Sequence, residues 1–220
     1  MSKSTWGDIP NWIHGATASL LEGLKTVDPV TYEHCCRVGE LARKLARDSG
    51  LSEYEQKLAE YSGIFHDIGK MGIGQEIIAK PGRLEAKELD IMRTHPLLSE
   101  DILKPLAEQH IFFHHLLPAV RGHHERVDGT GYPDKILGDR IPLMARIILI
   151  VDTYDAMSET RAYRKGLPTD IVYSELRRCS GTQFDAQLVK IFLEAHPNWA
   201  KQPSDPQTME YIRRKVAKAA

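Results

Sequence analysis

The chain has 220 residues, 42% of them hydrophobic and 27% charged, which is enough to bury one sizeable core. Its formal net charge of −1 gives no overall attraction to long nucleic acids or anionic membranes, so a phosphate-bearing ligand must be bound by a local group of cations, which fits a small ligand better than a long polyanion. No stretch of about 18 apolar residues predicts a membrane span, and the N-terminus lacks the pattern of a signal peptide, so we expect a cytoplasmic protein. Three cysteines without a CxxC spacing predict neither a disulfide framework nor a structural zinc site.

Residues 1–27 are expected to form an N-terminal helical extension. Their apolar side chains recur at the spacing of an amphipathic helix and include Trp6, Trp12, Ile13, Leu20, Leu21 and Leu24. Such a face fits a helix that caps the core, or a surface that binds a second copy of the chain or another signalling protein; capping is the favoured interpretation. No receiver, sensor or membrane module is expected before the domain that follows.

Helix signals then follow one another up to about residue 200 with almost no alternation of period two, so the predicted fold class is all-α. Asp28 and Pro29 begin the first of these helices and Gly50 ends it, while Ser52 and Glu55 form a capping box for the next. Later helices are predicted at about residues 85–93, 95–108, 111–124, 143–157, 169–179 and 186–196, followed by a solvated C-terminal tail over 201–220.

Two pairs of adjacent polar residues stand at predicted helix ends, His66-Asp67 and His123-His124. Because neighbouring side chains on a helix diverge by about 100°, such a pair reaches two metals more readily than it chelates one. Asp152 lies on an apolar helix face, where an ionised carboxylate is costly unless a cation or strong donors meet it. A metal ligand is favoured there over a buried salt bridge. Imidazoles with carboxylates suit iron, manganese or zinc better than magnesium.

The order of these motifs is similar to that of a known family. The other matching segments are His34, Lys70, Lys80-Pro-Gly82, His95-Pro96, Asp128-Gly-Thr-Gly-Tyr-Pro133, Asp155-Ala156, Arg161-Ala-Tyr-Arg164 and Gly181-Thr-Gln-Phe-Asp185. From about Asp28 to Ala195 the chain resembles the HD-GYP family of bacterial cyclic di-GMP phosphodiesterases. The resemblance implies an HD-domain helical bundle over residues 28–200 and a metal centre that hydrolyses cyclic di-GMP to linear pGpG, sometimes onward to GMP.

The resemblance also implies a set of metal ligands, namely His34, His66, Asp67, His95, His123, His124 and Asp152. Taken singly, the inward-facing His34 and His95 would be interpreted as core histidines. Asp67 is expected to bridge the metals, because a carboxylate has two oxygens to divide between them and a histidine has one free nitrogen. A water or hydroxide held between the metals would be the nucleophile. Lys70, one helical turn beyond Asp67, is expected to steady the scissile phosphate; the alternative is a solvated lysine at a helix end.

The loop that follows the histidine pair is expected to wall the substrate pocket. Gly129 and Gly131 permit close backbone approach, Tyr132 offers an aromatic face and a hydroxyl, and Pro133 stiffens the exit. A plain glycine turn is the alternative. Arginine and lysine suit phosphate, and arginine also pairs with guanine. The resemblance therefore suggests three further substrate contacts, from Lys80, Arg161 and Arg164.

One departure from the family bears on the number of metals. Trinuclear members carry a glutamate four residues before the first histidine, and this chain has Val30 there, so we expect a dinuclear centre of iron or manganese. Three functions stay open: a cyclic di-GMP phosphodiesterase, an HD hydrolase of another cyclic dinucleotide or phosphoester, and a catalytically silent cyclic di-GMP sensor or interaction module. The complete ligand set favours an enzyme. The intact loop over residues 128–133, called the GYP loop below, favours cyclic di-GMP together with Arg161 and Arg164.

Overall fold

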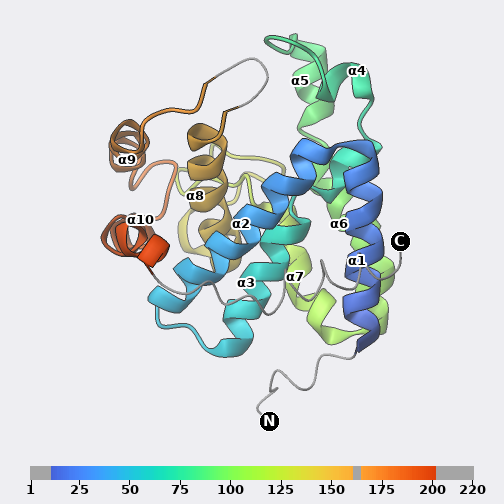
Figure 1. Cartoon of the computed structure of the whole chain (residues 1–220), viewed down its shortest axis with the longest axis horizontal. Helices are drawn as coiled ribbons and strands as arrows, with labels where there is room; N and C mark the ends of the chain where they lie inside the picture. Colours follow the sequence, from blue (N-terminus) through green and yellow to red (C-terminus); the bar gives the residue numbers. More distant parts are fainter. Residues whose placement is uncertain (1–10, 161–164, 202–220) are drawn as a thin grey trace.

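The computed structural model describes residues 11–160 and 165–201, which form a bundle of helices (Figure 1). Within these ranges the β-pairing is limited to two isolated bridges, Asp128–Leu137 and Ser180–Phe184, which confirms the predicted all-α class. The α-helices are α1 (Asn11–Val27), α2 (Pro29–Asp48), α3 (Glu53–Phe65), α4 (Gln75–Ile78), α5 (Ala86–Met92), α6 (His95–Gln109), α7 (Ile111–Gly122), α8 (Leu143–Ser158), α9 (Thr169–Arg178) and α10 (Ala186–Ala195). Short 3-10 helices are η2 (Ile68–Gly72), η3 (Gly138–Arg140) and η4 (His196–Lys201).

Local capping signals set the helix ends. The Asp28 side chain accepts hydrogen bonds from the first N–H groups of α2, and the predicted capping box of Ser52 and Glu55 begins α3. Asp185 caps α10 in the same way. The predicted helices from residue 85 onward are confirmed, with bounds that differ by at most two residues.

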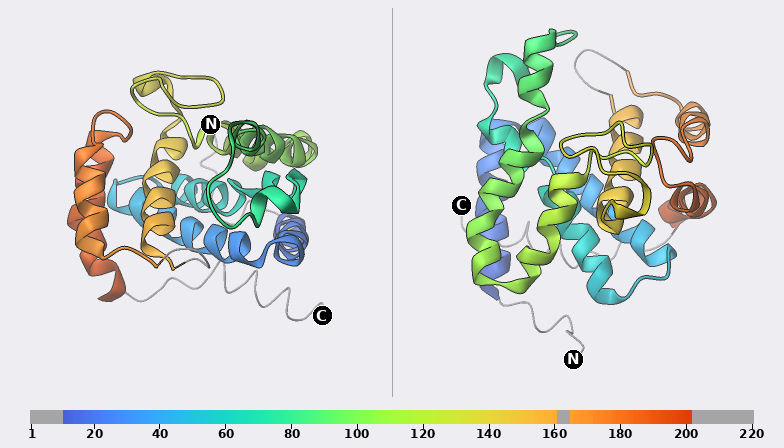
Figure 2. Two further views of the ribbon diagram at one scale, coloured as in Figure 1. Left: turned by 90° about the horizontal axis from the view of Figure 1, so that it is seen from above. Right: turned by 180° about the vertical axis from the view of Figure 1, so that it is seen from behind.

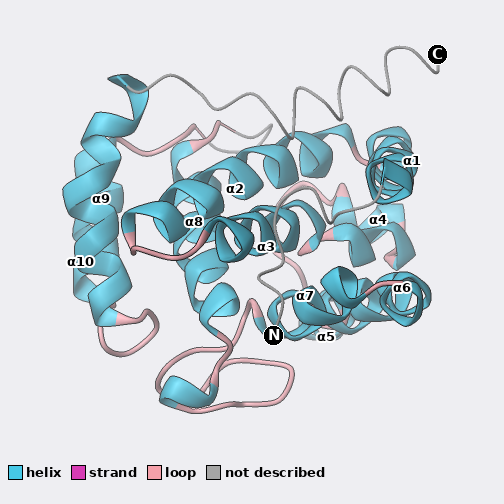
Figure 3. Ribbon diagram, turned by 90° about the horizontal axis from the view of Figure 1, so that it is seen from below, coloured by secondary structure: helices cyan, strands magenta, loops and turns pink. Residues whose placement is uncertain are grey.

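Helices α2 and α3 pack together in the middle of the bundle. One side of this pair carries α8, with α9 and α10 next to it. The other side carries α1, α6 and α7 (Figures 1 and 3). The short helices α4 and α5 project beyond α6 (Figure 2). This arrangement brings one end of each of α3, α6 and α7 close to the sides of α2 and α8.

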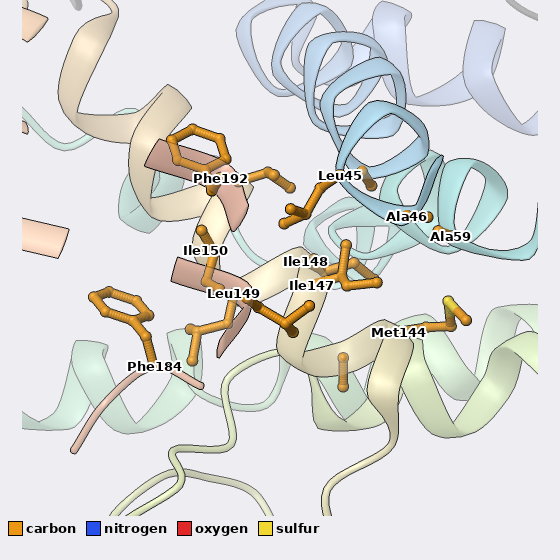
Figure 4. Close-up of a cluster of buried hydrophobic side chains, with 14 of the residues drawn as sticks. Leu45, Ala46, Ala59, Met144, Ile147, Ile148, Leu149, Ile150, Phe184 and Phe192 are labelled. Atoms are coloured by element: carbon orange, nitrogen blue, oxygen red, sulfur yellow. The ribbon is translucent and has the colours of Figure 1, made fainter. Parts of the chain in front are cut away.

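Two clusters of buried side chains hold these helices. One joins α2, α8 and α10 and includes Leu45, Ile148 and Phe192 (Figure 4). The other joins α1, α3 and α7 and includes Tyr61 and Phe112. Burying one such side chain contributes about 1.5–3 kcal/mol, so the two clusters together fix the helices that carry the site.

Helix α1 covers the second cluster. Ile13, Leu21 and Leu24 are fully buried there, which supports the capping interpretation for residues 11–27. Trp12 stays 43% exposed and stacks on Phe113. Trp6 and the predicted tail from residue 202 lie outside the described residues. Among the helices that the structure describes, none has the length and apolar character needed to cross a membrane.

Candidate metal centre

The ends of three helices meet the sides of two others at one buried point. His66 caps the C-terminus of α3, His95 is the first residue of α6, and His123 caps the C-terminus of α7. His34 comes from α2 and Asp152 from α8. Asp67 and His124 follow directly after two of these ends. The structure thus brings together all of the predicted metal ligands.

Three of the histidines are oriented by carbonyl oxygens at the C-terminal ends of helices, those of α3, α5 and α7. The Nδ1 atoms of His66, His95 and His123 lie 2.7, 2.7 and 2.6 Å from the carbonyl oxygens three residues earlier. Carbonyl oxygens at the end of a helix have no partner within it and can accept these bonds. With Nδ1 donating, the Nε2 atom of each ring is left free to bind a metal.

The ligand atoms form three overlapping groups of three residues. Within each group, all three ligand atoms lie within 4.8 Å of one another. These groups are His34, His66 and Asp152; His95, His123 and His124; and His66, Asp67 and His123. Asp67 stands between the first two groups. Its Oδ1 lies 3.1 Å from His95 Nε2, and its Oδ2 lies 3.3 Å from His66 Nε2 and 3.7 Å from His34 Nε2. The two oxygens of one carboxylate therefore face two different groups.

Carboxylates dominate the electrostatics on the His34 side. Burial opposes a charge on His34, but hydrogen bonds to Asp152 and Asp155 outweigh it and raise the pKa of His34 to about 9. Burial likewise opposes ionisation of Asp67, yet the Lys70 ammonium, 2.6 Å from Asp67 Oδ2, helps hold the pKa of Asp67 well below its usual range. The carboxylates around His34 therefore favour the binding of a cation on this side of the centre.

In the other group, the rings of His123 and His124 are neutral imidazoles. Burial and the nearby His124 lower the pKa of His123 well below its ordinary value, and burial with the nearby His95 lowers the pKa of His124 to about 3. A metal needs the neutral form of histidine, so these rings require no loss of a proton before they bind one.

Lys70 and Ser99 complete the support around Asp67. Lys70, on η2, points its ammonium at this carboxylate, 2.6 Å from Asp67 Oδ2, and its expected role at the scissile phosphate stays a prediction. The Ser99 hydroxyl accepts a hydrogen bond from the Gly69 N–H and donates one to the His66 carbonyl. A Cβ atom on Gly69 would collide with the backbone of His95 and Ser99, so only glycine allows η2 to lie this close to α6.

The GYP loop packs against the group of His95, His123 and His124, called the second histidine group below. The Tyr132 ring stacks on the His124 ring, with centroids 4.7 Å apart, and the Arg93 guanidinium lies 5.8 Å from the centroid of the Tyr132 ring. Gly129 has a φ of +74°, a conformation that favours glycine. At Gly131 a Cβ atom would lie 2.5 Å from the Arg126 nitrogen. Both glycines are thus required by the path of the loop.

The predicted substrate contacts are less well defined. The Lys80 ammonium lies 2.6 Å from Glu88 Oε2, in an ion pair between the segment after α4 and helix α5. Arg161 and Arg164 fall outside the described residues. Their roles remain predictions.

A family model described as "HD domain" matches residues 20–188. The chain belongs to the HD domain family. The match begins within α1, seven residues before the predicted end of the N-terminal extension at residue 27.

Named relatives of this HD domain are bacterial phosphodiesterases. The cyclic di-GMP phosphodiesterase response regulator RpfG of Xanthomonas campestris is 36% identical over 157 residues, covering 71% of this chain and 41% of that protein. The 3'3'-cGAMP-specific phosphodiesterase 3 of Vibrio cholerae is 37% identical over 142 residues, covering 64% of this chain and 30% of that protein. The chain spans less than half the length of the curated relatives it matches.

Solved structures share the fold. A cyclic GMP-AMP specific phosphodiesterase of V. cholerae superposes with a TM-score of 0.64 at 19% identity, covering 93% of this chain and 53% of that one. The HD domain of the phosphodiesterase PgpH from L. monocytogenes, in complex with cyclic-di-AMP, gives a TM-score of 0.54 at 20% identity and covers 82% and 95% of the two chains.

The donor atoms of this HD domain fit metal ions. His66 Nε2 and Asp67 Oδ1 are buried without a hydrogen-bond partner, at the point where the two groups meet. Buried polar atoms are costly when unsatisfied, and a metal would satisfy both. HD phosphohydrolases depend on metals, and the imidazole and carboxylate donors agree with that chemistry.

Two residues that support the site have no role predicted from the sequence. Glu125 is 1% exposed, and its carboxylate accepts hydrogen bonds from the backbone N–H groups of Asp134, Lys135 and Ile136. It fixes the loop that carries Tyr132. Asp155 accepts a hydrogen bond from His34 Nδ1. Asp155 lies in a segment that resembles the family, and Glu125 directly follows the pair His123-His124.

Proposed function

We propose that this HD domain is a metal-dependent phosphodiesterase that opens cyclic di-GMP to linear pGpG. The observation that carries the proposal is the pair of three-residue groups with Asp67 between them. His34, His66 and Asp152 would hold one metal, His95, His123 and His124 the other, and Asp67 would hold both. The domain would comprise residues 28–200, with residues 1–27 as a helical cap and residues 201–220 as a tail.

Iron or manganese is the proposed metal, because the resemblance to the HD-GYP family implies these ions and a mixed set of imidazoles and carboxylates suits them better than magnesium. When bound, two such metals polarise phosphoryl oxygens and lower the pKa of water, which is the chemistry that phosphodiester hydrolysis needs. Val30 carries no donor atom, and its side chain is 65% exposed beside His34. Two metals per chain are therefore proposed.

The chain's own residues would bind and orient the substrate. The Lys70 ammonium is positioned beside Asp67, where it would stabilise negative charge on the reacting phosphate. The Tyr132 ring would form one wall of the pocket, held in place by Glu125 and Gly131. Additional contacts to phosphate or guanine are proposed for Lys80, Gly129, Arg161 and Arg164.

Cyclic di-GMP is the favoured substrate because relatives that are 31–36% identical carry that name, among them proteins of Xanthomonas campestris and Pseudomonas aeruginosa. A second candidate is 3'3'-cGAMP, because V. cholerae relatives named for it are 33–37% identical. Both are cyclic dinucleotides with at least one guanine.

Anaerobic turnover of both dinucleotides by iron-loaded and manganese-loaded protein tests the proposal, with the products separated by chromatography. We expect cyclic di-GMP to be consumed faster and pGpG to form. Faster loss of 3'3'-cGAMP would reassign the substrate. If two metals are bound but neither dinucleotide is cleaved, the proposal is wrong, and tight binding of cyclic di-GMP in that sample would identify a sensor.

A further inference from the structure

One histidine of the centre is oriented differently from the others. Carbonyl oxygens at helix ends accept hydrogen bonds from the Nδ1 atoms of His66, His95 and His123. His34 lies inside α2, where the backbone carbonyl oxygens already accept hydrogen bonds within the helix. Its Nδ1 lies 2.7 Å from Oδ2 of Asp155, a residue of α8. The orientation of His34 therefore depends on a different helix.

Asp155 is itself held in place. Its side chain is buried, and Arg37 Nε and Nη2 donate to its Oδ1 and Oδ2 at 2.7 and 3.0 Å. Arg37 lies one helical turn beyond His34 on α2. Burial opposes ionisation of Asp155, but the hydrogen bonds from His34 and Arg37 outweigh it and keep the pKa of Asp155 below its usual value. Both carboxylate oxygens are thus engaged with α2, which makes Asp155 a support and not a ligand.

We infer that Asp155 is a positioning residue for one of the two metals, acting through His34, and that Arg37 fixes Asp155. An acceptor at Nδ1 sets the tautomer of a histidine, presents Nε2 to the metal and increases the basicity of the ring. In His34 the Nε2 so presented lies 3.0 Å from Asp152 Oδ1 and 3.7 Å from Asp67 Oδ2. The inference rests on the proposed metal centre.

The effect should be confined to one metal. The other metal-binding group consists of His95, His123 and His124 and does not include His34. In the described structure, none of these three residues contacts Asp155 directly. Loss of a supporting carboxylate of this kind costs roughly 10–100-fold in metal affinity. Removing Asp155 should therefore weaken the metal on the His34 side and leave the other metal in place.

The chain offers a matched control in Asp48. This residue lies on α2, and its carboxylate also accepts from an arginine, Arg47, and from a ring N–H, that of Trp199. It is not one of the proposed ligands or their supports. Asp48→Ala removes the same kind of contact without touching the centre.

The experiment titrates manganese into metal-free wild-type, D155A, D155N and D48A protein against a competing chelator, with circular dichroism as the measure of folding. We expect two sites in the wild type. D155A should weaken one of them about 10–100-fold. D155N should weaken the same site by less, because its neutral amide oxygen accepts a weaker hydrogen bond than a carboxylate does. D48A should match the wild type.

Three results would overturn the inference: unchanged affinities in D155N, equal weakening of both sites, or the same selective loss in D48A. If D155A does not fold, D155N decides alone. Absence of any metal from the wild type would instead refute the metal centre itself. Because the readout is metal affinity, failure to cleave a dinucleotide leaves this test unaffected.

Discussion

The ring of Tyr132 stacks on the ring of His124, with 4.7 Å between centroids and 24° between planes. This contact joins the GYP loop to a proposed metal ligand. The backbone adds a second link, from the Tyr132 N–H to the His124 carbonyl at 3.3 Å. The path of the loop thus sets the shape of the wall beside the second histidine group.

Gly131→Ala should therefore impair substrate binding while both metals are retained. Its Cβ atom would lie 2.6 Å from both Glu125 Cα and the His124 carbonyl oxygen, so the loop must move. A displacement of about 1 Å near a site can cost about 100-fold in activity. We expect a loss of that order in kcat/KM. Gly15→Ala is the control, because its Cβ meets no atom within 4 Å. Wild-type kinetics in G131A would refute the role of the loop.

Asp67→Ala should lose metal binding and activity but keep its helical circular dichroism. Asp67 faces both groups, whereas the helices are held by the apolar clusters around Leu45 and Phe112. Elemental analysis of the purified variant measures its metal content. A far-ultraviolet circular dichroism spectrum measures its helix content. Retention of metals together with turnover would show that Asp67 is dispensable.

Protein loaded anaerobically should contain close to two metals per chain. The two three-residue groups around Asp67 account for the proposed ligands, and Val30 adds none. Elemental analysis gives the number, and anomalous scattering from crystals gives the positions. A third metal near Val30 would contradict the expectation.

The two metals should respond differently to pH. The pKa of His34 is raised to about 9, so a metal must displace a proton there, and affinity should rise about tenfold per pH unit until pH 9 is reached. The pKa values of His123 and His124 are lowered, that of His124 to about 3, so these two rings should add almost no pH dependence to metal binding at the second site between pH 6 and 9. Chelator competition at pH 6.5, 7.5 and 8.5 tests this. Parallel changes at both sites would count against it.

The product should be pGpG, with slow or no conversion to GMP. Two metals suffice for one cut, but the terminal phosphate of pGpG adds negative charge, and Val30 supplies no ligand for a third cation to hold it. A chromatographic time course decides the matter. GMP that appears as fast as cyclic di-GMP disappears would refute the expectation.

The sequence by itself determined most of the helices and, through the resemblance, the identities of the proposed ligands. Capping residues such as Asp28 and Ser52 act within three or four residues of their position, so helix ends can be predicted from the local order of residues. The adjacent pairs His66-Asp67 and His123-His124 indicated a metal centre for the same reason, since neighbouring side chains point in directions that the helix fixes.

Only the tertiary structure decided which atoms face one another. The division of the two Asp67 oxygens between His95 and His66 depends on how η2 and α6 pack, which a Cβ atom on Gly69 would prevent. The contact between His34 and Asp155 joins residues 121 positions apart. Such pairs have no local signature, because the burial of apolar surface in the two clusters fixes the packing that brings them within hydrogen-bonding distance.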